Sequence, residues 1–400
     1  MSDRISTTAL YTQGLGAMLR GQTSIARTQL QLTSGNKWAS AADDPVGAGL
    51  GVVLDRANAQ LDSYATNAIS VSNRLNLEES ALSSVGDRIS RIKELALEAS
   101  NGTQSADSRA AIVAQLKQEY DGLVADANSG DGTGRYLFGG SQDSTAPFTS
   151  GAGGVNYVGD QTQRRVEIST SVSVNDSDAG SEVFQRIGTG NGSFAARAAA
   201  ANTGSLVMSA SQLDNTTAYD GGSYRVVFDG AGGYQVLDAS SALVSSGSYV
   251  AGNAITFRGA DLTFSGQPAA GDTFTVQPAP KKDLFATVQQ LIATTSATGT
   301  TPAQQAAQRN GFYAAIEDLD QAGKHVLDKR ADLGARLMTI DETASERSAQ
   351  TTSIKTTLSN LRDVDYAQAA SQLSLQTTAL QAAQLTFQKV QSLSLFNLLK

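Results

Sequence analysis

The sequence predicts an α+β fold. The two ends of the chain supply the long helices of an antiparallel bundle or coiled coil, and an inserted, mostly β domain lies between them. Prolines are absent from residues 46–146 and 303–400 of this 400-residue chain, and a proline inside a helix costs about 3 kcal/mol. Both stretches repeat apolar side chains every seven residues. Residues 188–271, by contrast, are rich in glycine and contain no lysine.

The first proline-free stretch carries a long heptad pattern. Two rows of side chains, three positions apart, each step by seven residues, and only Glu78 interrupts their apolar character. Such rows are typical of a coiled-coil or bundle seam, so we expect residues 61–99 to belong to a core. Asn101–Gly102 should end the helix. The rows are Leu54, Leu61, Ala68, Leu75, Leu82, Ile89 and Ala96, then Ala57, Tyr64, Val71, Glu78, Val85, Ile92 and Ala99.

The last proline-free stretch repeats this pattern. Its seven-residue row slips at Arg347 and then resumes. A long helix therefore returns along the first one. The row comprises Phe312, Leu319, Val326, Leu333, Ile340, Ile354 and Leu361.

The glycine-rich middle alternates apolar and polar residues instead. "SYRVVFDGAGGYQVLD" predicts two strands around the turn at 229–233, and further turns fall at Gly259, Gly266 and 271–272. "VNYVGDQTQRRVEIST" predicts another hairpin, turning at Gly159–Asp160. The predicted division is an N-terminal assembly arm (1–45), a helical bundle domain with a β-hairpin (46–187), an inserted β-rich outer domain (188–279), the returning helices of the bundle (280–356) and a C-terminal assembly helix (357–400).

Composition argues against several classes of protein. The formal net charge is −8, with +2 in residues 1–43, +1 in 357–400 and −11 between them, so we expect no nucleic-acid partner. The chain has no cysteine and one histidine, His325, which excludes disulfides and thiolate zinc sites. No apolar run approaches the roughly 18 residues of a membrane span, so we expect no membrane insertion. The N-terminus does not read as a cleavable secretory signal.

The two chain ends have too little apolar contact to fold alone. One partner helix covers only part of the apolar surface of residues 357–400, while each ordered residue loses about 1–2 kcal/mol of backbone entropy. We therefore expect the ends to be disordered in the monomer and helical once neighbouring subunits cover them. An intramolecular core is the alternative for these rows. The predicted assembly interface is Leu15, Leu19, Ala26, Leu30, Leu373, Leu380, Ala383, Phe387, Val390, Leu393, Leu395, Phe396, Leu398 and Leu399.

The acidic pair Asp43–Asp44 before Pro45 has three interpretations: a helix-capping turn, a metal or acid–base pair, and a turn that packs against a neighbouring subunit. Asp44 can cap free N–H groups and Pro45 suits a first helical position, so a helix-capping turn is favoured. A metal or acid–base pair lacks accompanying histidine or cysteine. Trp38 is expected to anchor this turn or a subunit contact.

Three further features favour structural roles over chemistry. His325 is expected to be a surface or seam residue, because a catalytic histidine needs an orienting partner. "GTGNGS" at 188–193 lacks the lysine of a phosphate loop and is expected to be a linker. Arg164–Arg165 is expected to be a solvated strand face.

Several motifs together resemble the FlgL family of flagellar hook–filament junction proteins (hook-associated protein three), in the flagellin superfamily. The resemblance covers nearly the whole chain. Flagellin shares the architecture of the ends, but "GRYLFGG" and "GDTFTVQP" favour the junction family. The matching stretches are "RIST" (4–7), "QLQLTSGNKWASAADDP" (29–45), "RLNLEESALSSVGDRISRIKELALEASNGT" (74–103), "GRYLFGGSQDSTAPF" (134–148), "YVGDQTQRRVEI" (157–168), "FRGADLTFSGQPAAGDTFTVQP" (257–278) and "ALQAAQLTFQKVQSLSLFNLL" (379–399).

The resemblance implies a structural subunit, not an enzyme, with no cofactor. It implies secretion unfolded through the flagellar type III export apparatus, with the export chaperone FlgN holding the C-terminal helix. It also implies self-assembly into a short tube between the first junction protein, FlgK, and flagellin, in the extracellular bacterial flagellum. The alternative within the same superfamily is a flagellin-type filament subunit. A ligand-binding or enzymatic strand domain is a more distant alternative, and residues 190–278 lack a converging set of His, Cys and Glu to support it.

Overall fold

The computed structural model describes residues 7–102, 104–151, 153–214 and 218–398, and it describes no side chain at residues 7, 8, 10 or 390–398. The chain divides into two compact units. The terminal unit comprises the two chain ends, up to Thr66 and from Thr343 onward, and the central unit is Asn67–Glu342. Long helices at both ends and strands between them confirm the α+β prediction.

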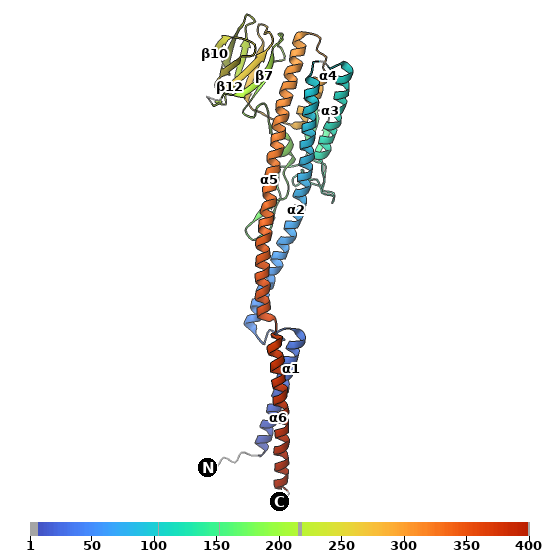
Figure 1. Ribbon diagram of the computed structural model, residues 1–400, viewed down its shortest axis with the longest axis vertical. Helices are drawn as coiled ribbons and strands as arrows, with labels where there is room; N and C mark the ends of the chain where they lie inside the picture. The colour runs from blue at the N-terminus through green and yellow to red at the C-terminus, as the bar shows by residue number, and fades with distance from the viewer. Residues whose placement is uncertain (1–6, 103, 152, 215–217, 399–400) are drawn as a thin grey trace. The chain divides into compact units, whose positions relative to one another are not determined.

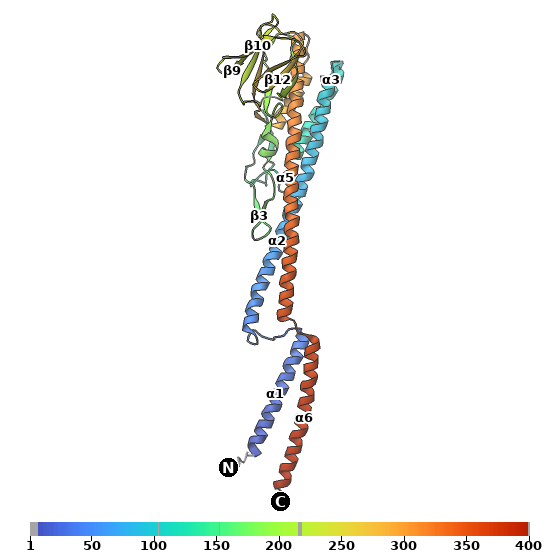
Figure 2. The same ribbon diagram turned by 60° about the vertical axis from the view of Figure 1, so that its left-hand side comes forward.

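The terminal unit is built from helices. The helices α1 (Thr7–Ser34) and α6 (Tyr366–Leu398) lie side by side and run in opposite directions (Figures 1 and 2). The start of α2 (Pro45–Ser100) and the end of α5 (Pro302–Arg362) belong to the same unit. Gly35, at φ +74°, ends α1 with its N–H donating to Gln31 O at 2.9 Å, a backbone conformation that favours glycine.

The helices of the central unit enclose the predicted heptad core. The remainder of α2 packs with α5 up to Glu342, and with α3 (Ala106–Ala127) and α4 (Leu284–Ser296). Ser105 caps α3 and Asp283 caps α4 through their side-chain oxygens. Within this unit the predicted core rows are confirmed, because these members are buried: Ala68, Val71, Leu75, Leu82, Val85, Ile89, Ile92, Ala96, Ala99, Phe312, Leu319, Val326, Leu333 and Ile340. In the terminal unit, Leu61 and Tyr64 of the same rows are buried, and Leu54, Ala57, Ile354 and Leu361 are half-buried.

Two antiparallel sheets make the inserted β domain, one ordered β10-β9-β8-β13-β6 and the other β11-β12-β7. Between them the Phe264 and Phe274 rings lie 4.6 Å apart, and Phe228 meets Phe264 edge-on at 5.6 Å. The predicted hairpin around 229–233 is confirmed, with Val226 opposite Val236. The strands are β6 (Phe194–Ala198), β7 (Val207–Leu213), β8 (Tyr224–Phe228), β9 (Gly233–Asp238), β10 (Leu243–Ser248), β11 (Ala254–Phe257), β12 (Ala260–Ser265) and β13 (Thr273–Pro278).

The predicted hairpin turning at Gly159–Asp160 is wrong. Strand β2 (Gly154–Tyr157) pairs with β1 (Phe148–Gly151), and β3 (Arg165–Glu167) pairs with β4 (Ser173–Asn175). The expected turn instead docks on an earlier loop, where Asp160 Oδ1 accepts from Ser141 N–H at 2.8 Å. A π-helical turn, η1 (Ser181–Gln185), and the short pair β5 (Ile187–Gly188) and β14 (Lys281–Lys282) complete the unit.

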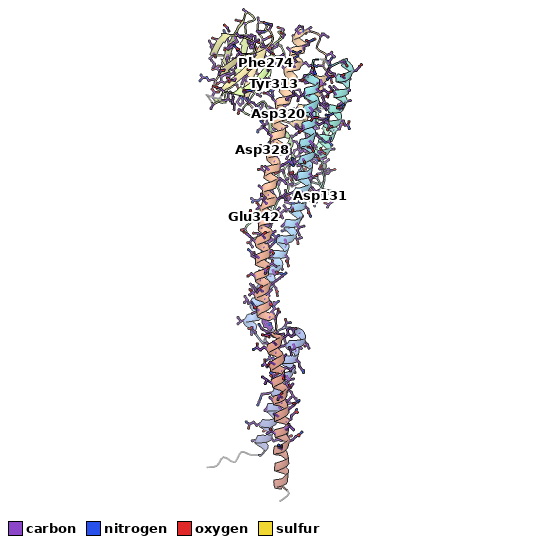
Figure 3. The ribbon with its side chains drawn as sticks, viewed as in Figure 1. Asp131, Phe274, Tyr313, Asp320, Asp328 and Glu342 are labelled. Atoms are coloured by element: carbon purple, nitrogen blue, oxygen red, sulfur yellow. The ribbon has the colours of Figure 1, made fainter. Side chains whose placement is uncertain are left out.

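Buried polar contacts fasten the β domain to α5. Asn310 of α5 accepts from Met208 N–H at 2.8 Å and donates to Leu206 O at 2.9 Å. Asp318 is buried between Arg197 and Lys282. Tyr313, labelled on α5 in Figure 3, packs against the aromatic core that contains Phe274. The β domain and this part of α5 therefore form one packed body.

Candidate functional site

The terminal unit holds most of the predicted site residues, and its seam sets mostly small or polar groups of α1 against larger side chains of α6. Tyr11 of α1 packs on Phe387 of α6 with ring centroids 5.2 Å apart. Gly14 lies so close to Phe387 that an added Cβ would come within 3.1 Å of the ring. Further along, Thr28 Oγ1 donates to Gln376 Oε1 at 3.1 Å. These α1 positions recur at heptad spacing and face α6.

The predicted interface residues fall on two different surfaces. On α1, Leu15, Leu19, Ala26 and Leu30 are all exposed, Leu19 at 54%. On α6, Leu373, Leu380 and Phe387 are half-buried, whereas Ala383 is exposed. Phe387 contacts α1, and Leu380 Cδ1 lies 3.5 Å from the Cβ position of Gly21.

Six predicted residues cannot be placed. Leu399 lies outside the described residues. No side chain is described for the other five, which are Val390, Leu393, Leu395, Phe396 and Leu398.

The terminal unit exposes further large apolar side chains that the heptad analysis did not select. Leu375 is 69% exposed on α6, whereas the predicted Leu373, Leu380 and Phe387 on that helix are half-buried. On α1 the sequence does carry a signal for the outward face, because Gly14 and Gly21 recur at heptad spacing on the face toward α6. The additional exposed residues are Tyr11, Val46, Leu50, Val52, Val53, Tyr366, Leu375 and Leu385.

The acidic turn before α2 begins the helix and closes on α1. Asp44 Oδ1 accepts from Gly47 N–H at 2.9 Å, and Pro45 is the first residue of α2. Asp43 accepts from Ala39 N–H and Ser40 N–H at 3.1 Å each and pairs with Arg27. The hydrogen bond from Ser40 N–H, then that from Ala39, lowers the pKa of the Asp43 carboxyl. Both acids therefore act as acceptors for backbone N–H groups.

Trp38 lines a cavity of about 200 Å³ beside this turn, together with Lys37, Leu361 and the two acids. Lys37 N–H donates to Arg362 O at 2.7 Å, and Val364 N–H donates to Gly35 O at 2.9 Å. The loop after α1 is thus joined by backbone hydrogen bonds to the loop before α6.

The other sequence candidates have structural partners in the central unit. His325 Nε2 lies 2.8 Å from Glu182 O. Gly190, within the glycine-rich loop, donates its N–H to the buried Asp318 carboxylate at 3.0 Å, and an acid at this place repels phosphate. Arg164, expected on a solvated face, pairs with the buried Asp176, whereas Arg165 is exposed.

A buried charge cluster in the central unit escaped the sequence analysis. Glu78 is fully buried and accepts from Asp178 N–H at 3.1 Å. Arg336 of α5 donates to Asp178 Oδ1 at 2.7 Å, and Arg74 lies 3.7 Å from Asp176. Burial, followed by the nearby Asp178 carboxylate, raises the pKa of Glu78 to about 8, so Glu78 is largely protonated at neutral pH. The only polar heptad position was visible in the sequence, but its partners lie a hundred or more residues away.

The side chains on the surfaces described above are suited to packing contacts. Within the described ranges no three His, Cys, Asp or Glu side chains are arranged to hold a metal ion. No described helix has the length and apolar character needed to cross a membrane. What the terminal unit offers is a helix pair with apolar side chains on its outer faces.

Two family models match the ends of the chain. The bacterial flagellin N-terminal helical region matches residues 5–143, and the bacterial flagellin C-terminal helical region matches residues 316–399. The flagellar hook-associated protein 3 of Salmonella typhimurium is 28% identical over 400 residues, which are 99% of each chain. That of Escherichia coli is 27% identical over 99% of this chain and 100% of its own length.

Solved structures carry the same name. The chain is similar to Xanthomonas campestris FlgL, at 42% identity and a TM-score of 0.72, over 76% of this chain and 99% of that one. It is also similar to the flagellar junction protein FlgL of Legionella pneumophila, at 29% identity and a TM-score of 0.70, over 79% of this chain and 100% of that one. The chain therefore belongs to the FlgL family of flagellar hook-associated proteins, within the flagellin superfamily.

Proposed function

We propose that this chain is a structural subunit that assembles with copies of itself into the junction between hook and filament of a bacterial flagellum. In this role it joins the first junction protein, FlgK, to flagellin. The observation that carries the proposal is the terminal helix pair, which leaves large apolar side chains such as Leu19 and Leu375 facing outward. Contiguous apolar surface of this kind marks a protein–protein contact.

The proposed assembly faces include both the predicted and the newly found residues. Leu15, Leu19, Ala26 and Leu30 supply one face of α1, and Leu375, Ala383 and Leu385 supply an outward face of α6. Leu373, Leu380 and Phe387 then hold the two helices together, so they act on assembly indirectly. Val390, Leu393, Leu395, Phe396, Leu398 and Leu399 extend the C-terminal contact, and Asp44 and Pro45 begin the helix next to it.

These faces lead us to assign a role to each part of the chain. Residues 1–45 and 357–400 serve as the assembly arm and assembly helix. Residues 46–187 and 280–356 form the supporting bundle, and 188–279 form an outer domain. Fully buried heptad positions such as Leu75 support a stable bundle, and exposed ends support an assembly role.

Export and location complete the proposal. The chain leaves the cell through the flagellar type III export apparatus, and the chaperone FlgN holds its C-terminal helix beforehand. Before export the apolar face of this helix has no partner subunit, so a chaperone that covers it would prevent aggregation. The subunit then resides outside the cell, catalyses no reaction and requires no cofactor.

The flagellin-type alternative has weaker support. The relatives matched over the whole chain carry the name hook-associated protein 3, and the solved structures at 42% and 29% identity carry the name FlgL. A filament subunit should polymerise into long filaments in vitro, and a junction subunit should not. Long filaments from the purified chain would favour the alternative.

A genetic test separates the proposal from its alternatives. In a strain whose own copy is deleted, we expect hooks without filaments, and we expect the full chain to restore filaments and motility. A chain lacking residues 373–400 should remain folded in its central unit but should not restore them. Restored motility with this truncation would contradict the assembly role of the terminal unit.

A further inference from the structure

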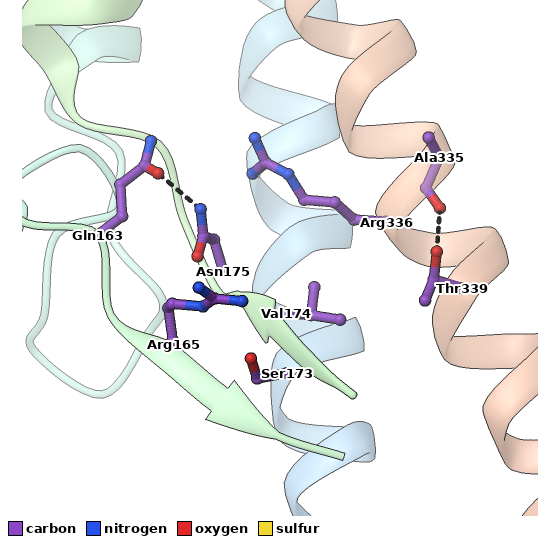
Figure 4. Close-up of a pocket in the computed structure, with 8 residues that line it drawn as sticks. All are labelled: Gln163, Arg165, Ser173, Val174, Asn175, Ala335, Arg336 and Thr339. Carbon is purple, nitrogen blue, oxygen red and sulfur yellow. Dashed lines mark hydrogen bonds between the residues drawn. The ribbon is translucent and has the colours of Figure 1, made fainter. Parts of the chain in front are cut away.

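A polar groove in the central unit lies between the hairpin β3–β4 and the helix α5. It has a volume of about 590 Å³. Arg165, Gln163 and Asn175 line it from the hairpin side, and Arg336 and Thr339 line it from α5 (Figure 4). Neither the heptad pattern nor the terminal helix pair accounts for this groove.

Two arginines bring positive charge to the groove. In Figure 4 the guanidinium groups of Arg165 and Arg336 extend into the space between hairpin and helix from opposite sides. Arg336 donates to Asp178 through Nη2, whereas its Nη1 is buried and finds no hydrogen-bond partner among the described atoms. Arg165 is exposed and forms no ion pair with any described side chain. Arg165 therefore leaves donors available for a planar anion such as a carboxylate, and Arg336 adds positive charge to the opposite wall.

The walls of the groove are held by buried groups, so its shape is fixed before any partner arrives. Asp178 holds Arg336 and itself donates its N–H to the buried Glu78. Asn175 donates to Gln163 at 2.6 Å across the base of the hairpin. These parts of the wall therefore need little further ordering when a partner binds, and Arg165 is the side chain that still has to be ordered.

An exposed apolar stripe runs along α5 beside the groove. Leu327, Ala331, Ala335 and Met338 follow one another at spacings of four, four and three residues, and all four are exposed. Met338, at 70%, is the most exposed large apolar residue described in the central unit. Apolar contact next to an ion pair removes water from it and strengthens it.

The charge of the chain indicates what fills the groove. Residues 67–342 carry 20 Lys and Arg against 30 Asp and Glu, a formal charge of −10. Copies packed side by side would present acids to one another, and a groove with the unpaired donors of Arg165 offers one of those acids a favourable place. We propose that the groove receives an Asp or Glu side chain from a second copy of this chain, while the Leu327–Met338 stripe packs against that copy. This inference rests on the proposed self-assembly and assigns one contact within it.

Photo-crosslinking in assembled flagella tests the contact directly. A photoreactive phenylalanine analogue replaces Met338 in one strain and Leu327 in another, both at exposed positions where the fold tolerates change. We expect irradiation to produce a covalent dimer of this chain whose crosslinked peptide contains Asp or Glu. Crosslinks only to another flagellar protein, or none in flagella that contain the chain at the junction, would overturn the groove contact while leaving the proposed function intact. Absence of the chain from flagella would overturn both.

Charge variants sharpen the test. In the Met338 crosslinking background we expect Arg165→Glu to lower the dimer yield roughly fivefold to tenfold, the usual range for one interfacial ion pair, and Arg165→Lys to retain most of it. Arg225→Glu is the matched control, because Arg225 is also an exposed arginine on a strand but lies in β8, away from the groove. A dimer yield unchanged by Arg165→Glu, or lowered equally by both reversals, would contradict the proposed ion pair.

Discussion

Both helix pairs of this molecule repeat apolar side chains every seven residues, but these side chains are buried in one pair and largely exposed in the other. In the central unit, the seam of α2 and α5 is filled by fully buried residues such as Leu75, Leu82 and Leu319. In the terminal unit, the seam sets Gly14, Gly21 and hydrogen-bonded Thr28 of α1 against α6, and large apolar side chains such as Leu19 and Leu375 lie outside it.

This comparison shows that a heptad locates a helix face without telling which partner covers it. The central seam receives further cover from α3, α4 and the loops around η1, so its apolar residues become core. The terminal seam has one partner helix within the chain, and its apolar residues are left for other molecules. Four changes break or sharpen this contrast.

The largest difference is expected between buried and exposed ion pairs. Asp318 of the central unit is 3% exposed and is held by Arg197, Lys282 and Gly190 N–H. Asp318→Ala should lower the free energy of unfolding by about 3–5 kcal/mol, because it leaves Lys282 without its acid and Gly190 N–H without its acceptor at a buried site, and Arg197 keeps only Glu317. Asp55, which pairs with Arg362 and is 50% exposed, is the control, and Asp55→Ala should cost at most about 1 kcal/mol. Urea denaturation followed by circular dichroism measures both, and similar losses would contradict the contrast.

Truncating one leucine in each helix pair, a buried one in the central unit and an exposed one in the terminal unit, should give the next largest difference. Leu82→Ala removes a fully buried side chain of α2 and should cost about 2–5 kcal/mol, since the helix cannot collapse into the cavity. Leu19→Ala on α1 should change stability by no more than about 0.5 kcal/mol. The same denaturation series checks both variants. A large loss from Leu19→Ala in the dilute monomer would place Leu19 in an intramolecular core.

The buried Glu78 should make the stability of the central unit depend on pH. Its pKa is raised from 4.5 to about 8, so between these values the folded state keeps a proton that the unfolded chain has released. The free energy of unfolding should therefore fall as pH rises through this window, by up to about 1.4 kcal/mol per pH unit from this group. Glu78→Gln should remove that slope, leaving the variant similar to the parent near pH 5 and more stable near pH 8.

Glu94→Gln supplies the control for this pH series. Glu94 lies on the same helix but is exposed and pairs only with Arg91 among the described residues. Its variant should keep the slope of the parent. Equal slopes for Glu78→Gln and the parent would show that Glu78 titrates normally.

The smallest effect concerns the glycine seam of the terminal unit. A Cβ at Gly21 would meet Leu380 at 3.5 Å, an ordinary contact, and alanine favours helix over glycine by about 1 kcal/mol. Gly21→Ala should therefore raise the protection of α1 amides in the dilute chain by up to roughly fivefold, measured by hydrogen exchange. Slow exchange throughout both ends of the unmodified chain would contradict the expectation that they fold only on assembly.

Much of the fold could be predicted because large apolar residues report local periodicity. The burial of Leu75 and Leu333 and the hairpin around 229–233 follow from patterns within a few turns of chain. The pairing of β1 with β2 and of β3 with β4 was missed, because several strands lie within reach and alternation does not select between partners.

The candidate site was harder to predict for a related reason. On the α1 side the α1–α6 seam includes Gly14, Gly21 and Thr28, which carry no hydrophobic signal, so sequence analysis selected the opposite face of α1. On α6 it did select Leu380 and Phe387, which contact α1. The charge cluster joins Glu78, Asp178 and Arg336, which only the tertiary fold brings together. The groove beside Arg165 depends on that cluster and could not have been found without it.

The placement of Glu78 also limits how α2 and α5 can slide along each other within the central unit. Glu78 is tied to α5 through Asp178 and Arg336, and two direct cross-links, Glu79 to Arg330 and Lys93 to Asp320, lie on the same pair of helices. A slip of one helical turn, about 5.4 Å, would break all three links together. It would also leave the Glu78 carboxyl group without a partner in an apolar seam. Under a shear load along their axes, the two helices therefore hold their register until the whole set gives way at once.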